Sequence, residues 1–287
     1  MSTAAVTARR LSSFVKLEHT LFALPYAYVG AILAVHGRPT LHDLVWITVA
    51  MAGARSLAMA LNRLIDASLD ARNPRTAGRE LPRGLLTRGQ VLAFCAVSLV
   101  VFAVAVLQLA PLTRPLAPIV VVAFVVYPYL KRFTPLCHVA LGAIDGLAPV
   151  GAWVAIRNEL DWRAFLIGAV VLFWMAGFDV IYATLDVEHD RAAGLHSIPA
   201  SLGLAGGLLV ARVFHVLAVA SMVAVGVALH LGVAYALGVV VCAALLAYEN
   251  AIVKPDDLSR VNAAFFNVNA VLAAIYLAAV ALDVAVS

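Results

Sequence analysis

The sequence predicts an all-α polytopic membrane protein of about nine transmembrane helices bundled around a central cavity. Two observations carry this prediction. Apolar residues make up 64% of the 287 positions and charged residues only 13%, whereas a soluble domain is about half apolar and about a quarter charged. The apolar residues also fall in runs of about 20, the length that a helix needs to cross a bilayer.

The predicted spans follow one another along the whole chain. Backbone groups in lipid must pair within their own segment, so the spans are helices rather than strands. We expect one membrane-embedded domain, 1–287, with a cytoplasmic arm at 1–19 and cytoplasmic loops at 65–89 and 185–205. The nine spans lie at about residues 20–36, 42–64, 90–110, 114–130, 136–156, 162–184, 206–228, 231–249 and 261–283.

The distribution of Lys and Arg predicts the orientation of the chain. Cytoplasmic loops of membrane proteins carry an excess of these residues. Of the 20 Lys and Arg residues, fifteen lie in the N-terminal arm or beside the loops after spans 2, 4, 6 and 8, and four lie on the opposite side. We therefore expect an integral protein of the plasma membrane, with its N-terminus in the cytoplasm and no nucleic-acid partner.

The stretch "NRLIDASLDARNPRT", residues 62–76, places charge at the cytoplasmic end of span 2. Residues four apart on a helix share a face, about 6 Å from each other. Asn62, Asp66 and Asp70 therefore form one polar stripe, and Arg55, seven residues earlier, falls on the same face.

Span 6 ends in a second stripe, formed by Asp179, Asp186 and Asp190 with Tyr182 beside them. Like charges four apart repel each other. An Asp inside a membrane also costs about 2.5–3.5 kcal/mol on insertion scales. Both stripes are therefore expected to bind a cation.

Magnesium suits such stripes, because Mg²⁺ prefers oxygen ligands and is typically bound by one or two carboxylates plus substrate phosphates. Two stripes facing each other across a cavity would hold Mg²⁺ around a diphosphate, and basic side chains would bind the remaining phosphate oxygens. The basic residues nearby are Arg72, Arg75, Lys131 and Arg132. The alternative is that both stripes are salt-bridge clusters that anchor helix ends.

These motifs resemble those of a known family. The stretch from Asn62 resembles the first signature of the UbiA superfamily of intramembrane aromatic prenyltransferases, N-x-x-x-D-x-x-x-D followed by x-x-N-x-R-T. "DVIYATLDVEHDRAAGLHSIPASLG", residues 179–203, resembles the second, D-x-x-Y-x-x-x-D-x-x-x-D. "YPYLK", residues 127–131, and the nine spans also match, so the resemblance covers essentially the whole chain. Arg63 departs from it, because many members carry Asp there.

The resemblance implies Mg²⁺-dependent transfer of a polyprenyl group from a polyprenyl diphosphate to an aromatic acceptor. The acceptor would be of the 4-hydroxybenzoate or dihydroxynaphthoate type, in ubiquinone or menaquinone biosynthesis. The residues implied to bind Mg²⁺-diphosphate are Asn62, Asp66, Asp70, Asp186 and Asp190. The residues expected to bind the substrates are Arg72, Arg75, Lys131, Arg132, Lys16 and His19, the last two in "VKLEHTLFALPYA".

The chemistry predicts further roles. Departure of diphosphate leaves an allylic cation that water would quench, so the reaction requires a dry cavity. Aromatic faces stabilise such a cation, and the candidates are Tyr127, Tyr129, Trp174, Phe178 and Tyr182. Asp179 is a candidate to accept the proton that the acceptor ring loses. Asp179 and Tyr182 match the start of the family's second motif and Lys131 matches its loop lysine, so the resemblance implies that the catalytic residues are Asp179, Tyr182 and Lys131.

Other residues within the spans are given different roles. Asp145 either belongs to a functional site or pairs with Arg55. His138, close to the start of a span, is expected to pack at the membrane interface. Three amides are expected to form interhelical hydrogen bonds, and three small residues to allow close helix packing. The amides are Asn262, Asn267 and Asn269, and the small residues are Gly142, Gly146 and Gly151.

Three other functions compete with this interpretation. Prenyltransferases of other lipid or pigment pathways carry similar motifs. A secondary transporter would use intramembrane Asp and Arg for ion coupling, but transporters place such charges near the midplane, in broken helices. A CDP-alcohol phosphotransferase would show one continuous D-x-x-D-G-x-x-A-R motif, which this sequence lacks.

Overall fold

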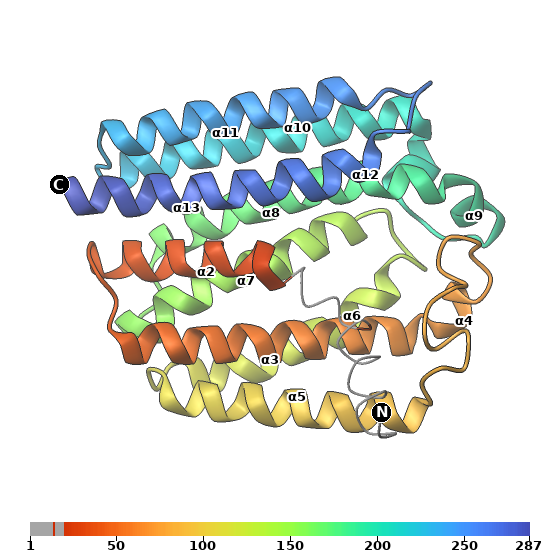
Figure 1. Cartoon of the computed structure of the whole chain (residues 1–287), viewed down its shortest axis with the longest axis horizontal. Helices are drawn as coiled ribbons and strands as arrows, with labels where there is room; N and C mark the ends of the chain where they lie inside the picture. Colours follow the sequence, from red (N-terminus) through yellow and green to blue (C-terminus); the bar gives the residue numbers. More distant parts are fainter. Residues whose placement is uncertain (1–13, 15–19) are drawn as a thin grey trace, which may run out of the picture.

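The structure is a computed structural model of the chain, and it describes Phe14 and residues 20–287. The described residues form an all-helical bundle, with the long helices side by side (Figure 1). The helices are α2 (Thr20–Val35), α3 (Leu41–Ile65), α4 (Ala67–Asp70), α5 (Arg88–Gln108), α6 (Thr113–Leu130), α7 (Cys137–Arg157), α8 (Trp162–Ala183), η2 (Thr184–Asp186), α9 (Val187–Ala192), α10 (Ile198–Ala228), α11 (Val233–Ile252), α12 (Val261–Ala263), the π-helical turn η3 (Ala264–Val268) and α13 (Asn269–Val286).

The expected fold class is confirmed. Among the residues described, eight helices are long and apolar enough to cross a membrane, and α2, with 16 residues, is a shorter apolar helix. Together they account for the nine predicted spans. The protein is thus an integral membrane protein.

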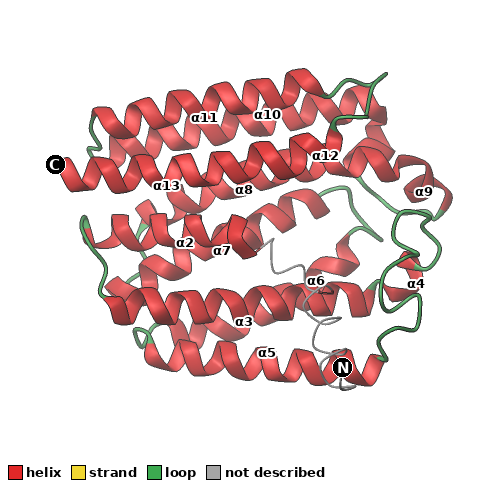
Figure 2. Cartoon of the chain, viewed as in Figure 1, coloured by secondary structure: helices red, strands yellow, loops and turns green. Residues whose placement is uncertain are grey.

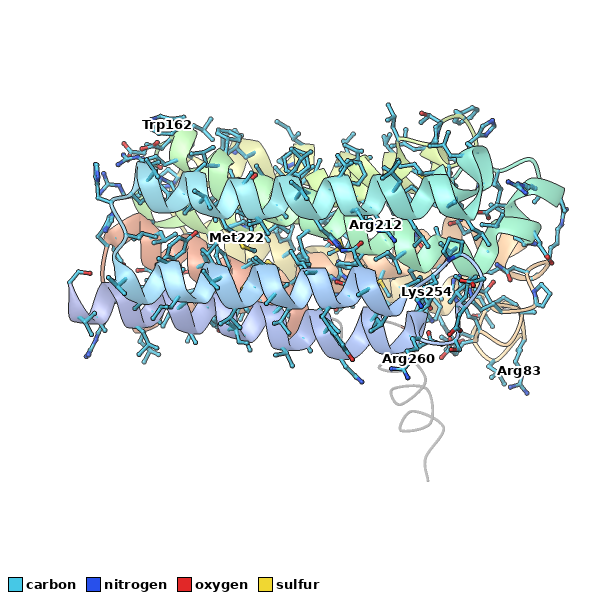
Figure 3. All side chains as sticks on the ribbon, turned by 90° about the horizontal axis from the view of Figure 1, so that it is seen from above. Arg83, Trp162, Arg212, Met222, Lys254 and Arg260 are labelled. Carbon is cyan, nitrogen blue, oxygen red and sulfur yellow. The ribbon has the colours of Figure 1, made fainter. Side chains whose placement is uncertain are left out.

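The short helices α4 and α9 lie at one end of the bundle, opposite the C-terminus (Figure 1). The longer loops gather there as well (Figure 2). We call this end, formed by residues 65–87 and 184–197, the motif end. Arg83, Lys254 and Arg260 lie at this end, whereas Trp162 lies at the other (Figure 3).

Side-chain caps define where several helices begin. The Thr40 side chain accepts a hydrogen bond from the backbone of Asp43, whose carboxylate in turn accepts from the Thr40 backbone, and this capping box starts α3. Thr87 and Gln90 form the same box before α5. Such reciprocal bonds satisfy amides that have no partner in the first turn of a helix. The two boxes therefore set where α3 and α5 start.

The core lies where α8 packs between α7 and α10. Two of the small residues predicted to allow close packing do so. A Cβ on Gly142 would collide with the carbonyl of Leu172 in α8, and one on Gly146 would lie 2.6 Å from the carbonyl oxygen of Gly168. Gly151 differs, because a Cβ there meets nothing within 4 Å.

The predicted loop at 185–205 is wrong over most of its length, because η2, α9 and the start of α10 occupy it. Helix α10 begins at Ile198, after the N-cap Ser197, and not near residue 206. It bends at Gly203, where φ is +76° and ψ is 170°. Its 31 residues correspond to about 46 Å, more than the roughly 30 Å hydrocarbon core. The first turns of α10 therefore belong to the motif end.

Candidate active site

Three cavities follow one another through the bundle. The polar cavity, of about 220 Å³, lies at the motif end and is lined by both predicted motifs. The middle cavity, of about 170 Å³, shares Asn62, Tyr127 and Asp179 with it. The apolar cavity, of about 150 Å³, shares Arg55 and Asp145 with the middle cavity. The order of the cavities, from polar to apolar, suits a ligand with a charged head and an apolar tail.

The first motif stays helical across a break in α3, which keeps its side chains together. The amide of Asp66 donates to the carbonyl of Asn62 at 2.9 Å, and the amide of Asp70 donates to that of Asp66 at 2.8 Å. All three residues line the polar cavity. The buried carboxylate of Asp66 lies 2.6 Å from Lys131 Nζ and 3.3 Å from Arg132 Nη2. The end of α6 thus neutralises Asp66.

The basic loop after α4 folds back onto both motifs. Arg79 Nη1 donates to both carboxylate oxygens of Asp70, at 2.8 Å each. Arg75 Nε donates to Asp186 Oδ1 at 2.8 Å, and its Nη1 donates to the Tyr182 hydroxyl at 3.0 Å. Burial alone would lower the pKa of Arg75, but the hydrogen bonds and charge of Asp186 outweigh it, and the net pKa is raised. This loop therefore links the two motifs.

The second motif spreads over the end of α8 and the two short helices that follow it. Asp179 lies in α8, Asp186 in η2 and Asp190 in α9, and all three line the polar cavity. Asn73, from the basic loop, donates to Asp186 Oδ1 at 2.9 Å. His138 lies beside Asp179, with Nδ1 2.6 Å from Asp179 Oδ2. The two predicted stripes therefore face one cavity.

The donor set of the polar cavity fits Mg²⁺ in chemistry, because it consists of carboxylate and amide oxygens. Its present arrangement is different: within the described part of the chain, no three acidic, His or Cys side chains converge on one point. Basic side chains lie against Asp66, Asp70 and Asp186 instead. A metal would therefore have to replace these basic partners, and substrate phosphates would complete its ligand set.

Some predicted residues lie elsewhere. Arg72 is exposed and does not line any of the three cavities, and Arg132 touches Asp66 without lining the polar cavity. Tyr129 is 40% exposed, and its ring stacks on the guanidinium of Arg132 instead of lining the middle cavity. The predictions for Lys16 and His19 fall outside the described residues.

The sequence did not predict the partners of three residues that line the polar cavity. Asn73 belongs to the first signature and Arg79 to the loop after it, but neither had a predicted partner. The expectation that His138 packs at the membrane interface is wrong, because this buried residue binds Asp179. His138 is a polar residue in the first turn of a span that follows a cytoplasmic loop. That position was the signal in the sequence that could have placed it at the site.

Arg55 and Asp145 form an ion pair, which confirms one of the two alternatives for Asp145. Arg55 Nη1 lies 3.0 Å from Asp145 Oδ1 and 3.3 Å from Oδ2. Within the described residues, the buried Nε of Arg55 has no hydrogen-bond partner. The pair lines both the middle and the apolar cavities, so it marks the boundary between them.

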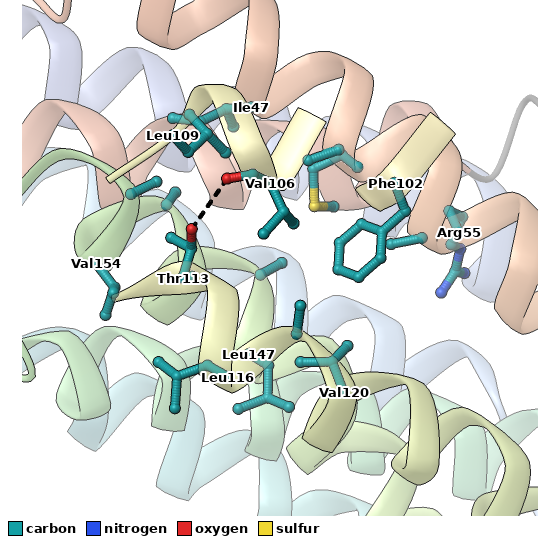
Figure 4. Close-up of a pocket in the computed structure, with 18 of the residues that line it drawn as sticks. Ile47, Arg55, Phe102, Val106, Leu109, Thr113, Leu116, Val120, Leu147 and Val154 are labelled. Carbon is teal, nitrogen blue, oxygen red and sulfur yellow. Dashed lines mark hydrogen bonds between the residues drawn. The ribbon is translucent and has the colours of Figure 1, made fainter. Parts of the chain in front are cut away.

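The apolar cavity lies between α3, α5, α6 and α7 (Figure 4). Phe102 and Val106 line it from α5, Leu109 lines it from the residue that follows α5, and Arg55 lies towards one side. The hydroxyl of Thr113 donates to the carbonyl oxygen of Ala110 at 2.7 Å, so its polar group is directed to backbone. The wall is therefore suited to hydrocarbon.

Of the three amides predicted to join helices, only Asn269 does so in the described structure. Trp174 Nε1 donates to Asn269 Oδ1 at 2.6 Å, and Asn269 Nδ2 donates to Glu249 Oε1 at 3.1 Å. Asn262 and Asn267 are exposed instead. Asn269 and Trp174 both line the middle cavity, so this hydrogen-bonded network fixes part of its wall.

An all-helical membrane bundle with a charged cavity joined to an apolar one defines a class: membrane enzymes that act on substrates with an anionic head and a lipid tail. Comparison with known proteins identifies the group within that class. The model of the UbiA prenyltransferase family matches residues 23–271. The chain belongs to this family, and it is a membrane prenyltransferase.

Relatives and solved structures agree with this membership. A 4-hydroxybenzoate octaprenyltransferase of Vibrio atlanticus (strain LGP32) is 30% identical over 264 residues, which are 91% of this chain and 89% of that protein. The apo structure of a UbiA homologue from Aeropyrum pernix K1 is 34% identical, with a TM-score of 0.85 over 93% of this chain and 98% of that one. A UbiA homologue from Archaeoglobus fulgidus, bound to DMAPP and Mg²⁺, is 16% identical, with a TM-score of 0.75 over 97% of this chain and 100% of that one. At that identity it shows the same fold.

Proposed function

We propose that this prenyltransferase transfers a polyprenyl group from a polyprenyl diphosphate to an aromatic acid of the 4-hydroxybenzoate type, with Mg²⁺. The observation that carries the proposal is the continuity of the polar, middle and apolar cavities, which share lining residues in turn. The name of the Vibrio atlanticus relative supports this acceptor class. A dihydroxynaphthoate-type acceptor is the alternative within the same reaction.

The diphosphate would lie in the polar cavity. Asn62, Asp66, Asp70, Asp186 and Asp190 would hold Mg²⁺, which when bound neutralises the charge that develops on the leaving group. Basic side chains released from the carboxylates would then bind phosphate oxygens. These are Arg75, Arg79 and Lys131, supported by Arg132. Arg72, which lines none of the three cavities, remains a proposed substrate contact, as do Lys16 and His19 outside the described residues.

The transfer of the prenyl group to the acceptor ring would take place in the middle cavity. The bond between C1 of the allylic chain and the diphosphate oxygen breaks, and the electron pair leaves with the diphosphate. Trp174 and Phe178, with ring centroids 5.0 Å apart in an edge arrangement, would present aromatic surface to the allylic cation. Tyr182 would do so at the polar side. The acceptor ring then bonds to C1, and Asp179 accepts the ring proton.

The remaining parts of the proposal concern the tail and the membrane. The isoprenoid chain would lie along the apolar cavity. The motif end would face the cytoplasm of a plasma membrane, as the excess of basic residues indicates. Because the C-terminus lies at the opposite end of the bundle, a reporter fused there should fold outside the cell. A cytoplasmic reporter signal would contradict this orientation.

Turnover of defined substrates tests the function. Protein purified in detergent is incubated with Mg²⁺, a polyprenyl diphosphate and a panel of aromatic acids, and prenylated product is measured. Asp66→Ala and Asp186→Ala should lower turnover by about 100-fold or more, the loss typical when a group that stabilises developing charge is removed. Asp256→Ala, an exposed carboxylate, serves as the matched control. Full activity of Asp66→Ala would refute the metal site.

A further inference from the structure

His138 connects three helices through one imidazole ring. It is the second residue of α7 and is 3% exposed. Its Nδ1 lies 2.6 Å from Oδ2 of Asp179 in α8. Its Nε2 lies 3.2 Å from the backbone nitrogen of Ile198, the first residue of α10. The adjacent Cys137 adds a second link, because its Sγ donates to the carbonyl of His196 at 3.5 Å.

These contacts determine the tautomer of His138. A backbone N–H can only donate, so Nε2 must present its lone pair to Ile198 and carries no proton. The proton of the neutral ring is therefore on Nδ1, where it is donated to Asp179. In a neutral imidazole the bond made by one nitrogen sets the role of the other. The start of α10 thus dictates that His138 donates to Asp179.

The hydrogen bond from His138 is important because Asp179 is the proposed proton acceptor. Its carboxylate lines both the polar and the middle cavities, and its side chain is 24% exposed. It therefore lies between the proposed place of the diphosphate and that of the acceptor ring. A hydrogen bond to one oxygen restrains the rotation of a carboxylate, and a general base must meet its proton at hydrogen-bond distance.

We propose that His138 is a positioning residue, which as the Nδ1–H tautomer orients the Asp179 carboxylate towards the ring proton of the acceptor. This inference rests on the proposed function. In the step concerned, the ring carbon has already bonded to C1 of the prenyl group. Its C–H bond then breaks, the electron pair restores aromaticity, and the proton moves to Asp179. His138 keeps its proton throughout, and Nε2 is occupied by the amide of Ile198.

The test compares substitutions of His138 in the full-length protein in detergent. His138→Leu removes both hydrogen bonds. In His138→Gln the amide supplies a donor for Asp179 and an acceptor for Ile198. His215→Leu is the matched control, because His215 is also 3% exposed and hydrogen-bonded, to Asn250 on α11, and lines none of the three cavities.

The readouts are kcat, KM for the polyprenyl diphosphate, and the rate with acceptor deuterated at the ring carbon that is prenylated. His138→Leu should lower kcat by about 10-fold or more, within the range for general-base catalysis, and leave KM unchanged. Deuterium should slow His138→Leu but not the wild type, because proton loss becomes rate-limiting. His138→Gln should restore kcat and abolish the isotope effect.

Three results would overturn the proposal. A loss of kcat in His138→Leu without an isotope effect, or an equal loss in His215→Leu, indicates a purely structural role. A raised KM with unchanged kcat in His138→Leu indicates a role in binding instead. If His138→Leu does not fold, His138→Asn tests the proposal. Its Nδ2 takes the place of the imidazole Nδ1, so this variant keeps the hydrogen bond to Asp179 and loses the one from Ile198. An isotope effect in that variant refutes the proposal. A wild type that prenylates no acid refutes the proposed function instead.

Discussion

The Arg55–Asp145 ion pair allows a quantitative prediction for a charge pair inside a membrane bundle. The side chains are 18% and 11% exposed, and the nearest atoms are 3.0 Å apart. At an effective dielectric constant of about 20, two unit charges at that distance attract each other by roughly 5–6 kcal/mol. Asp145→Leu leaves the Arg55 charge unpaired, and the free energy of unfolding should fall by about 3–5 kcal/mol.

Removing both charges should cost much less. The double variant Arg55→Met with Asp145→Leu fills the site with apolar side chains, and such replacements are often close to neutral. The coupling energy between the two positions should therefore be at least about 2 kcal/mol, as measured for close charge pairs elsewhere. The assay is equilibrium unfolding in mixed micelles with increasing SDS, followed by near-UV circular dichroism, for the four proteins of the cycle.

A surface pair provides the control for this cycle. Arg157 and Glu159 lie 3.0 Å apart, but each side chain is 47% exposed. Exposed pairs contribute about 0–1 kcal/mol, so their coupling energy should fall in that range. If the effects at Arg55 and Asp145 simply add, or couple no more strongly than those of the surface pair, the two charges do not stabilise each other and the reasoning is refuted.

Three further predictions concern backbone, cavity and metal. Gly203→Ala should lower the free energy of unfolding by about 1–3 kcal/mol, because the backbone conformation of Gly203 is almost restricted to Gly. The control is Gly89→Ala, in the first turn of α5 with no close neighbour, which should stabilise the protein. Equal effects of the two substitutions in SDS titrations would contradict this prediction. Gly151→Leu should shift the preferred donor towards shorter chains in competition assays, since Gly151 lines the apolar cavity and a Cβ there meets no atom within 4 Å. An unchanged preference would contradict the placement of the tail in this cavity. A chelator should stop turnover without changing the unfolding midpoint, because the first-motif carboxylates already have basic partners; a large destabilisation would show that a metal supports the fold.

The sequence was sufficient for those features that depend on local pattern. Runs of apolar residues predicted the membrane helices, and four-residue spacing placed Asp66 and Asp70 on one face. Seven-residue spacing also put Arg55 on that face, and the alternative in which it pairs with Asp145 is confirmed. Each of these inferences needs only the geometry of one helix, or a charge that must find a partner in lipid.

Features that depend on how distant segments fold together were not predictable. Arg75 meets Asp186 across 111 positions of sequence, and nothing in the spacing of a loop encodes such a contact. His138 reaches Asp179 because α7 and α8 pack in one register, through Gly142 and Gly146. The start of α10 is different, because Ser197 followed by Ile198 and Pro199 is a typical helix N-terminus that the apolar run concealed.

The pairing of carboxylates with basic side chains at the motif end has a consequence for catalytic turnover. On the proposed function, loading the site is an exchange in which the number of ion pairs hardly changes. Arg75, Arg79 and Lys131 now lie against Asp186, Asp70 and Asp66. These carboxylates would hold Mg²⁺ in their place, and the displaced side chains would bind phosphate oxygens. The affinity then reflects only the difference between two sets of pairs. Once the prenyl group has left, Arg79 and Lys131 would compete again for Asp70 and Asp66, and this competition would help to expel the spent diphosphate.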